Sequence, residues 1–228
     1  MKILSYIKKL PIYIRSLYFN IKYLPFYQAI KLPILVGRLN VNGGGKIILQ
    51  SDSLYKGMIR LGFKMVGVYP DRGLTLENHG VIIFKGSAVI GNDCYISVGS
   101  KGRLELGYNF VSTAGLKLVC SKSIIFGENT LVGWDCKFMD TNFHQLYDLK
   151  AKRYKPACGS ILIGENNWFA TGCTVMHSVQ TPAHASFGLN SVVTRNAPMK
   201  SYAVMGGSPL RVLTEGVDRI NGKDTIPF

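Results

Sequence analysis

Residues 163–193 read IGENNWFATGCTVMHSVQTPAHASFGLNSVV, and this stretch repeats with a period of six. A mostly apolar residue stands at every sixth position, at Ile163, Phe169, Val175, Thr181, Phe187 and Val193. Six residues at about 3.3 Å each are enough for one short strand and one corner. Three such strands would close a coil of about 18 residues that stacks on the next coil. The stretch therefore predicts a parallel β-helix in which these guide residues point inward.

The same spacing returns in the preceding part of the chain. Further guide residues are Ile90 and Ile96, then Leu106, Ser112, Leu118 and Ile124, then Phe126, Val132 and Phe138. The fourth position after a guide residue is small or modest, as at Cys94, Thr130, Cys136, Asn167, Cys173 and Ser191. The alternative is a β-sandwich, but sandwich strands alternate with a period of two and do not keep a six-residue phase over such a length. We therefore expect an all-β domain.

Three segments depart from the repeat, so we divide the chain into an N-terminal segment (1–35), a β-helix domain (36–213) and a tail (214–228). Apolar residues in the N-terminal segment recur at spacings of three and four, at Ile7, Leu10, Ile14, Leu17, Ile21 and Leu24. This pattern predicts an amphipathic helix. Pro11 favours a helix start near that residue and Pro25 marks a stop, so two short helices are expected. After about Val212 neither period persists, which indicates a loose tail.

Residues 139–162 interrupt the coils with MDTNFHQLYDLKAKRYKPACGSIL. An insertion that leaves a coil has to protrude, and loops that protrude from a rigid scaffold often carry function.

The net charge of +14 is unevenly placed, because residues 1–51 hold eight Lys or Arg and no Asp or Glu. Such a positive field attracts anions. The basic segment could cap the open end of the β-helix, lie on an anionic membrane beside a lipid-linked sugar, or bind nucleic acid. No recognised motif supports nucleic acid, and we expect no such partner.

Charged residues or prolines interrupt every apolar run, so no transmembrane span or secretory signal is expected. The five cysteines are odd in number and contain no CxxC pair. Reduced, mostly buried cysteines fit a cytoplasmic protein.

Three motifs carry a resemblance to a known family: DTNFH at 140–144, SVVTR at 191–195 and GGSPLR at 206–211. With the repeat and the insertion, they make the chain resemble the hexapeptide-repeat acyltransferase superfamily. Within it, the chain looks most like bacterial sugar O-acetyltransferases of capsule, O-antigen and exopolysaccharide. The resemblance implies a left-handed β-helix, a homotrimer with active sites between subunits, acetyl coenzyme A as the acyl donor and a sugar or polysaccharide as the acceptor.

The resemblance makes His144 the expected catalytic base. Transfer from a thioester to a hydroxyl needs a group that takes the hydroxyl proton, and imidazole titrates near working pH. If the loop is extended, Asp140, Asn142 and His144 point the same way, because side chains of a strand alternate. Asp140 would then orient the imidazole, and Asn142, where the family commonly has Asp, would bind substrate.

Further site residues come from the same resemblance. Trp168 is expected in the substrate channel. The coenzyme A groove would be formed by Thr194, Arg195, Gly206, Gly207 and Arg211, with arginines facing phosphate. Ser208 replaces the usual Asn, which leaves one hydrogen bond in doubt.

Three alternatives stay open. An N-acyltransferase on an amino sugar would need the same base. A zinc protein of the gamma carbonic anhydrase type would need three histidines, but the spacing of His144, His177 and His184 does not match it. A non-catalytic scaffold would bind no acetyl coenzyme A. We expect no metal, and we expect a cytoplasmic protein that is free or at the inner face of the membrane.

Overall fold

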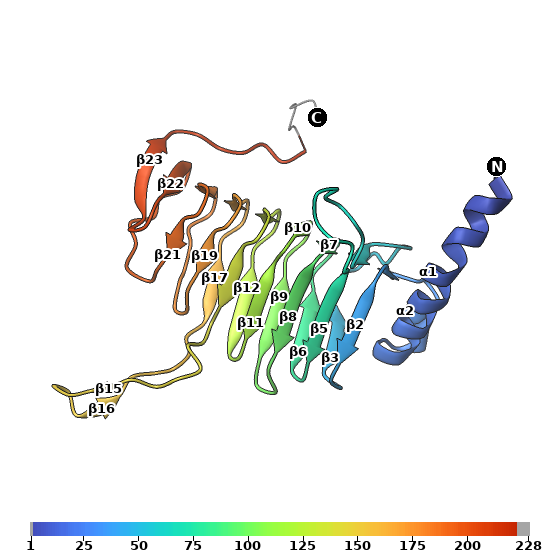
Figure 1. The fold of residues 1–228 in the computed structure, drawn as a ribbon, viewed down its shortest axis with the longest axis horizontal. Coiled ribbons are helices and arrows are strands. Elements are labelled where there is room, and N and C mark those ends of the chain that lie inside the picture. Colours follow the sequence, from blue (N-terminus) through green and yellow to red (C-terminus); the bar gives the residue numbers. More distant parts are fainter. Residues whose placement is uncertain (1, 223–228) are drawn as a thin grey trace.

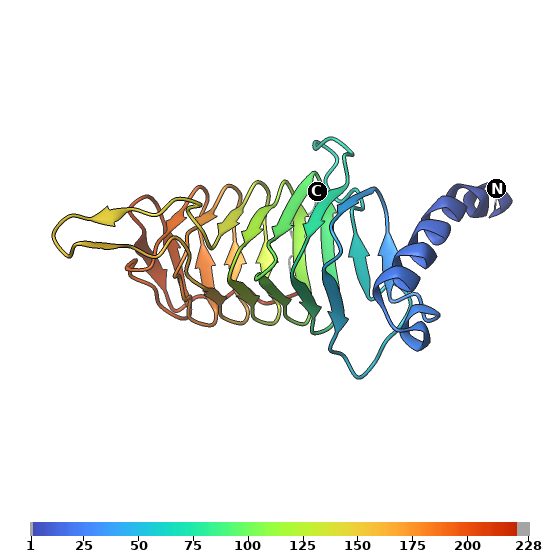
Figure 2. The same cartoon turned by 90° about the horizontal axis from the view of Figure 1, so that it is seen from below.

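The computed structural model describes the backbone of residues 2–222 and the side chains of residues 10–222. Its strands wind into a three-sided parallel β-helix, as the six-residue repeat predicts (Figures 1 and 2). The first side holds β1 (Ile34–Val36), β4 (Ile59–Leu61), β7 (Ala88–Asn92), β10 (Phe110–Ala114), β13 (Leu131–Val132), β18 (Trp168–Phe169), β20 (Ala185–Phe187), β22 (Ala203–Gly206) and β23 (Arg211–Glu215).

The other two sides follow the same order along the axis. The second side holds β2 (Leu39–Asn42), β5 (Leu74–Asn78), β8 (Cys94–Val98), β11 (Lys117–Cys120), β14 (Lys137–Met139), β19 (Thr174–Val175) and β21 (Val192–Val193). The third side holds β3 (Lys46–Leu49), β6 (Val81–Phe84), β9 (Arg103–Leu106), β12 (Ser123–Phe126) and β17 (Ile161–Ile163). Strands that follow each other in these lists pair in parallel, except β22 and β23.

The guide residues form the core, and each of them is at most 4% exposed. Five phenylalanines stack along the axis with ring centroids 4.6–5.1 Å apart, at Phe110, Phe126, Phe138, Phe169 and Phe187. Such close aromatic packing adds to the burial of apolar area that stabilises each coil. The six-residue period therefore predicts correctly which side chains point inward.

The coil length of 18 holds only near the C-terminal end. Phe169 pairs with Phe187, 18 residues on, but Leu104 pairs with Ile124, 20 residues on. The longer coils carry their extra residues between the second and the first side, because Ile90 and Ile96 are six residues apart whereas Leu118 and Val132 are 14 apart. At several corners Asn and Asp adopt positive φ, as at Asp93 (56°) and Asn109 (58°). Asn and Asp tolerate this left-handed conformation better than other side chains that carry a Cβ.

The N-terminal helix differs from the prediction. Helix α1 (Lys2–Tyr23) runs on through Pro11 rather than starting there, and only the single turn α2 (Phe26–Ala29) follows Pro25. Proline removes one intrahelical hydrogen bond without necessarily ending a helix, and α1 is held by its packing on β1. The expected stop before Pro25 is confirmed. The side chain of Ile7 lies outside the described residues.

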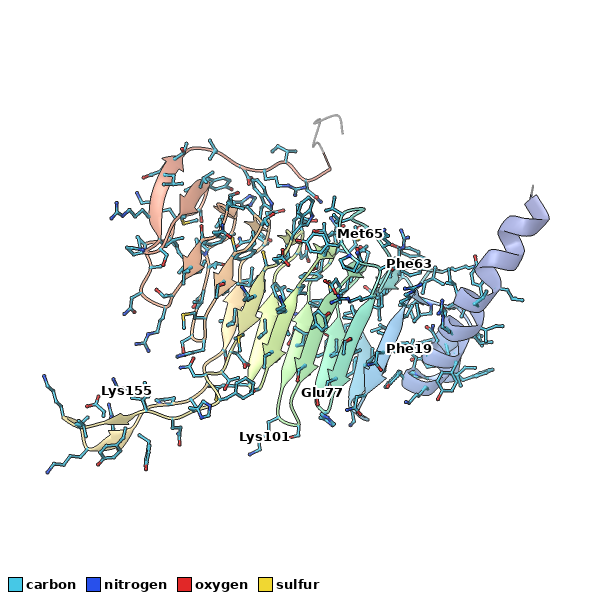
Figure 3. The ribbon with its side chains drawn as sticks, in the orientation of Figure 1. Phe19, Phe63, Met65, Glu77, Lys101 and Lys155 are labelled. Carbon is cyan, nitrogen blue, oxygen red and sulfur yellow. The ribbon has the colours of Figure 1, made fainter. Side chains whose placement is uncertain are left out.

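Helix α1 covers the open edge of the first side (Figure 3, Phe19). The buried amide of Asn20 accepts from the N–H of Ile34 at 3.2 Å and donates to its C=O at 2.7 Å. The hydroxyl of Ser16 accepts from the N–H of Val36 at 2.9 Å. Two helix side chains thus bond β1 as a neighbouring strand would, which is one way to protect a sheet edge. Capping of the β-helix by the N-terminal segment is confirmed for this edge.

The C-terminal segment is more ordered than a loose tail. Strand β23 pairs antiparallel with β22, and the chain then turns back along the coils (Figure 1). There Asp218 contacts His184 at 2.7 Å, and Asn221 donates to Asn129 at 3.2 Å. Residues 223–228 lie outside the described part of the chain. Among the helices that the structure describes, none has the length and hydropathy needed to cross a bilayer.

The insertion forms an arm, residues 141–158, between β14 and β17. Thr141 and Cys158 bridge at its base, and β15 (Tyr147–Asp148) pairs antiparallel with β16 (Arg153–Tyr154) farther out. The arm projects near the end of the prism opposite α1 (Figures 1 and 2). The protruding loop is thus confirmed.

Candidate active site

A groove of about 740 Å³ lies between the arm and the last coils. The arm lines one side with Asn142, His144 and residues of its hairpin, while two corners of the coils line the other with Met176, His177, Ser178, Thr194, Arg195 and Asn196. Ligand pockets for small molecules commonly span about 300–1,000 Å³. The groove is therefore large enough for a substrate of that size.

The fold itself brings the corner residues together. Strands β19 and β21 are neighbours on the second side, with Val175 opposite Val193. Met176 and His177 follow the first strand, and Thr194 and Arg195 follow the second. Both pairs consequently leave the second side at the same corner of successive coils, facing the arm.

His144 stands on the arm and is exposed to the groove. Among the side chains that the structure describes, none forms a hydrogen bond with its ring. A general base must present a free lone pair to the proton it removes. The imidazole of His144 meets this condition.

The ring of His177, in contrast, is held on both nitrogens. Its Nε2 lies 3.1 Å from the side-chain amide nitrogen of Asn142, and its Nδ1 lies 3.2 Å from the hydroxyl of Ser178. An amide nitrogen can only donate, so Nε2 accepts and Nδ1 carries the proton, an assignment made from the partners. The lone pair of His177 is thus occupied by Asn142.

Asp140 does not face His144, and the expectation that it orients the imidazole is not met. Its side chain is fully buried. One oxygen accepts from the N–H of Ser121 at 2.7 Å, and the other accepts from Lys122 at 2.7 Å and Ser123 at 2.8 Å. The corner of the preceding coil leaves these three N–H groups without strand partners, and the carboxylate satisfies them. Asp140 therefore anchors the root of the arm.

The assumption of an extended loop explains why this expectation failed. Phe143 has a φ of +59°, so the chain turns between Asn142 and His144. Alternation of side chains holds only along an extended strand. Consequently His144 points into the open groove, while Asn142 contacts His177. Asp140 lies in a bend directly after β14, where its carboxylate faces the corner of the preceding coil.

The groove is rich in positive charge. Arg153, Lys155 and Arg195 line it, against the single carboxylate of Asp148. The backbone N–H of Ala151 is the main reason why the pKa of Asp148 lies below its ordinary value. Asp148 also lies 3.5 Å from Lys155, which Figure 3 marks on the arm. The remaining cations favour an anionic ligand.

The structure places the other predicted site residues away from this groove within one chain. Trp168 lies on the first side and is 37% exposed. Gly206 ends β22 and Gly207 begins the turn into β23, where Gly207 has a φ of +98° that suits glycine. Arg211 is exposed at the start of β23. A single chain thus gathers Asn142, His144, Thr194 and Arg195, but not these four.

Sequence reasoning missed His177 and Ser178, because it considered His177 only as a zinc ligand and did not consider Ser178. A signal was present, because His177 precedes Arg195 by 18 residues, the length of one coil in this region. Equivalent corners of successive coils lie side by side. Counting one coil back from a predicted site residue would have identified His177.

Within the described part of one chain, the histidines considered for zinc are not grouped as metal ligands. His184 stacks on Tyr202 with centroids 4.6 Å apart and contacts Asp218, on a different side from the groove. Among residues 2–222, no three His, Cys, Asp or Glu side chains are grouped as metal ligands.

Solved structures share this architecture. The polysialic-acid-specific acetyltransferase NeuO superposes with a TM-score of 0.61 at 15% identity, over 85% of this chain and 82% of that one. A hexapeptide-repeat acetyltransferase from Vibrio cholerae complexed with acetyl coenzyme A gives 0.40 at 15% identity, over 90% and 85%. The polysialic acid O-acetyltransferase OatWY gives 0.35 at 16% identity, over 84% and 93%. No family model and no curated protein matches the sequence. The likeness to NeuO identifies the fold as a left-handed parallel β-helix, as expected.

Proposed function

We propose that the protein is an O-acyltransferase that moves an acetyl group from acetyl coenzyme A to a sugar hydroxyl. The acceptor would be a surface polysaccharide or its precursor. One observation carries the proposal: the free imidazole of His144 faces a basic groove that also holds Thr194 and Arg195.

The chemistry needs one base and no covalent intermediate on the protein. His144 would take the proton of the acceptor hydroxyl as its oxygen attacks the thioester carbonyl. The carbon–sulfur bond then breaks, and the proton passes from the imidazolium to the departing thiolate. His177 is less suited to this role, because Asn142 occupies its acceptor nitrogen.

Charge and lining support the donor. The phosphates of coenzyme A are anions, and Arg195 can bind phosphate through a planar, two-pronged group. Thr194 and Met176 beside it would line the path of the pantetheine arm. The likeness to NeuO, which is specific for polysialic acid, supports a sugar acceptor as the starting hypothesis.

A homotrimer would complete the site. Trp168 and Arg211 lie on the first side, whereas His144 lies on the arm near the corner that follows the second side. Only a neighbouring copy could bring these residues to the groove. The apolar side chains of the arm support such a contact, because Leu146 is 67% exposed and Leu149 is 83% exposed. We also infer that the protein works in the cytoplasm, at the inner face of the membrane.

A panel of acceptors tests the proposal. Thiol release from acetyl coenzyme A would be measured with neutral sugars, acidic sugars and amino sugars, and the products would be analysed for ester or amide. Ester formation supports the proposal, whereas amide on an amino sugar would make the protein an N-acyltransferase. Absence of both, with no thermal shift by coenzyme A, would leave a scaffold and refute the proposal.

A further inference from the structure

Helix α1 carries a second apolar stripe on the face turned away from the β-helix. Ser16, Phe19, Asn20 and Leu24 are buried against the first coil. On the opposite face lie Leu10 (56% exposed), Ile14 (61%), Leu17 (44%), Tyr18 (69%) and Ile21 (54%). A surface helix of a soluble protein normally keeps its outer face polar. Here the outer stripe has no partner within the described chain.

Helix α2 extends this apolar surface. It packs against α1 and exposes Phe26 (72%), Tyr27 (64%) and Ile30 (59%). Both helices stand at the end of the prism beyond β1 and β2 (Figures 1 and 2). Exposed apolar side chains gathered on two neighbouring helices indicate an interaction site.

The charge around the stripe has one sign. Arg15 and Lys22 are exposed on α1 and Lys31 is exposed just after α2, and residues 1–51 contain no acidic residue. Lys22 and Lys46 also line a groove of about 540 Å³ between the helices and the edge strand β3. An apolar and aromatic stripe bordered only by cations is complementary to a bilayer with anionic headgroups.

We infer that this end of the β-helix docks on a membrane rich in anionic phospholipid, with the outer stripe of α1 and the apolar residues of α2 buried at the interface. The inference rests on the membrane location proposed above and not on acyl transfer. The arm and its groove then face away from the bilayer, because they lie near the other end of the prism.

A second copy of the chain is the competing occupant, since Leu10, Ile14, Leu17 and Ile21 alternate at spacings of four and three. That spacing suits a coiled coil, but coiled-coil pairing normally uses opposite charges beside the seam. All charges of residues 1–51 are positive. The exposed aromatics of α2 also extend the surface beyond α1. Both observations favour lipid.

Docking in this way has a consequence for the acceptor. Seven strands of the second side separate the two ends of the prism, and neighbouring strands lie about 4.8 Å apart, so the last coil stands about 30 Å above the first. A short lipid headgroup would not reach this height. The acceptor would have to be an extended saccharide chain that rises from the membrane.

Flotation of the full chain with vesicles tests the inference. The vesicles would contain phosphatidylcholine alone or phosphatidylcholine mixed with phosphatidylglycerol. Wild type should bind the mixed vesicles and release them at high salt. Each cation near an anionic leaflet adds about fivefold to binding, so exchange of Arg15, Lys22 and Lys31 for Gln should weaken it about 100-fold.

Matched variants separate this surface from general stickiness. Replacing Ile14, Leu17 and Ile21 with Gln should abolish flotation. Circular dichroism should show that this variant remains folded. Flotation should be unchanged in two control variants, one with Lys101, Lys117 and Lys137 replaced by Gln. The other has Val68, Leu189 and Ile220 replaced by Gln.

Two outcomes of the variant experiments would overturn the inference. One is equal flotation of wild type and both helix variants. The other is a smaller particle mass by light scattering for the triple apolar variant, which would make the stripe an interface between copies. Failure of flotation together with normal thiol release would remove the membrane docking and leave the proposed chemistry in place.

Discussion

Asp140 offers a quantitative test of how the arm is held. Replacing it with alanine leaves the N–H groups of Ser121, Lys122 and Ser123 without their acceptor. An unsatisfied buried donor costs about 1–3 kcal/mol. The three residues lie near the surface, where water can replace part of the lost hydrogen bonding. We therefore take the low end of this range for each N–H group and expect the free energy of unfolding to fall by about 3 kcal/mol in all. For a chain of this size that lowers Tm by about 6–12 °C.

Thermal unfolding followed by circular dichroism, at one protein concentration, measures this loss. Glu128→Ala is the matched control, because Glu128 is an exposed carboxylate at another corner, and its Tm should stay within about 2 °C of wild type. Below its Tm, the Asp140→Ala protein should retain most of its kcat, since Asp140 does not reach His144. An unchanged Tm with a kcat reduced about 100-fold or more would refute the reasoning and restore Asp140 as the partner of the imidazole.

Three further predictions concern the donor site, the capped edge and a buried acid. Arg195→Gln should raise the KM for acetyl coenzyme A about 10-fold with little change in kcat, measured by steady-state thiol release, because it removes a phosphate contact; an unchanged KM contradicts it. The Ser16→Ala, Asn20→Ala double variant should lose about 2–4 kcal/mol of stability in urea unfolding, because the edge of β1 loses its partners; a loss under about 0.5 kcal/mol would mean that water caps the edge equally well. Burial opposes ionisation of Glu105, but hydrogen bonds from Lys85 at 2.8 Å and Arg103 at 2.6 Å outweigh it and lower its pKa. A carboxyl group whose pKa is lower in the folded chain stabilises the fold at pH values above its unfolded pKa, about 4.3. That stabilisation is lost as the pH falls through the lower pKa of the folded state. The Glu105→Gln variant should therefore be less stable than wild type by about 1 kcal/mol at pH 7, and this difference should vanish in acid. A difference that persists at low pH would mean that packing, and not the charge of Glu105, causes it.

The inward-pointing residues could be predicted from the sequence, because each coil of the β-helix repeats the same six-residue pattern. Phe169 and Phe187 follow the same six-residue frame, and each is buried for the same reason. Coil length was not predicted, because the extra residues between Leu118 and Val132 leave both Ile124 and Phe126 pointing inward. The continuation of α1 through Pro11 depended on tertiary contacts that local propensity does not contain.

The family resemblance indicated His144, Thr194 and Arg195, and all three line the groove. The directions of Asp140 and His144 were not predictable, since Asp140 follows the N–H groups of the preceding coil and His144 follows the positive φ of Phe143. A residue that joins the site only beside a second copy, as we propose for Trp168, is not recognised from the packing of one chain.

The central proposition is that the unpaired ring of His144, and not the engaged ring of His177, removes the acceptor proton. Steady-state thiol release from acetyl coenzyme A by His144→Ala and His177→Ala, each with the best acceptor of the panel, tests this directly. We predict that kcat falls about 100-fold or more for His144→Ala and less than about 10-fold for His177→Ala. The reverse order, or an unchanged kcat for His144→Ala, would contradict it.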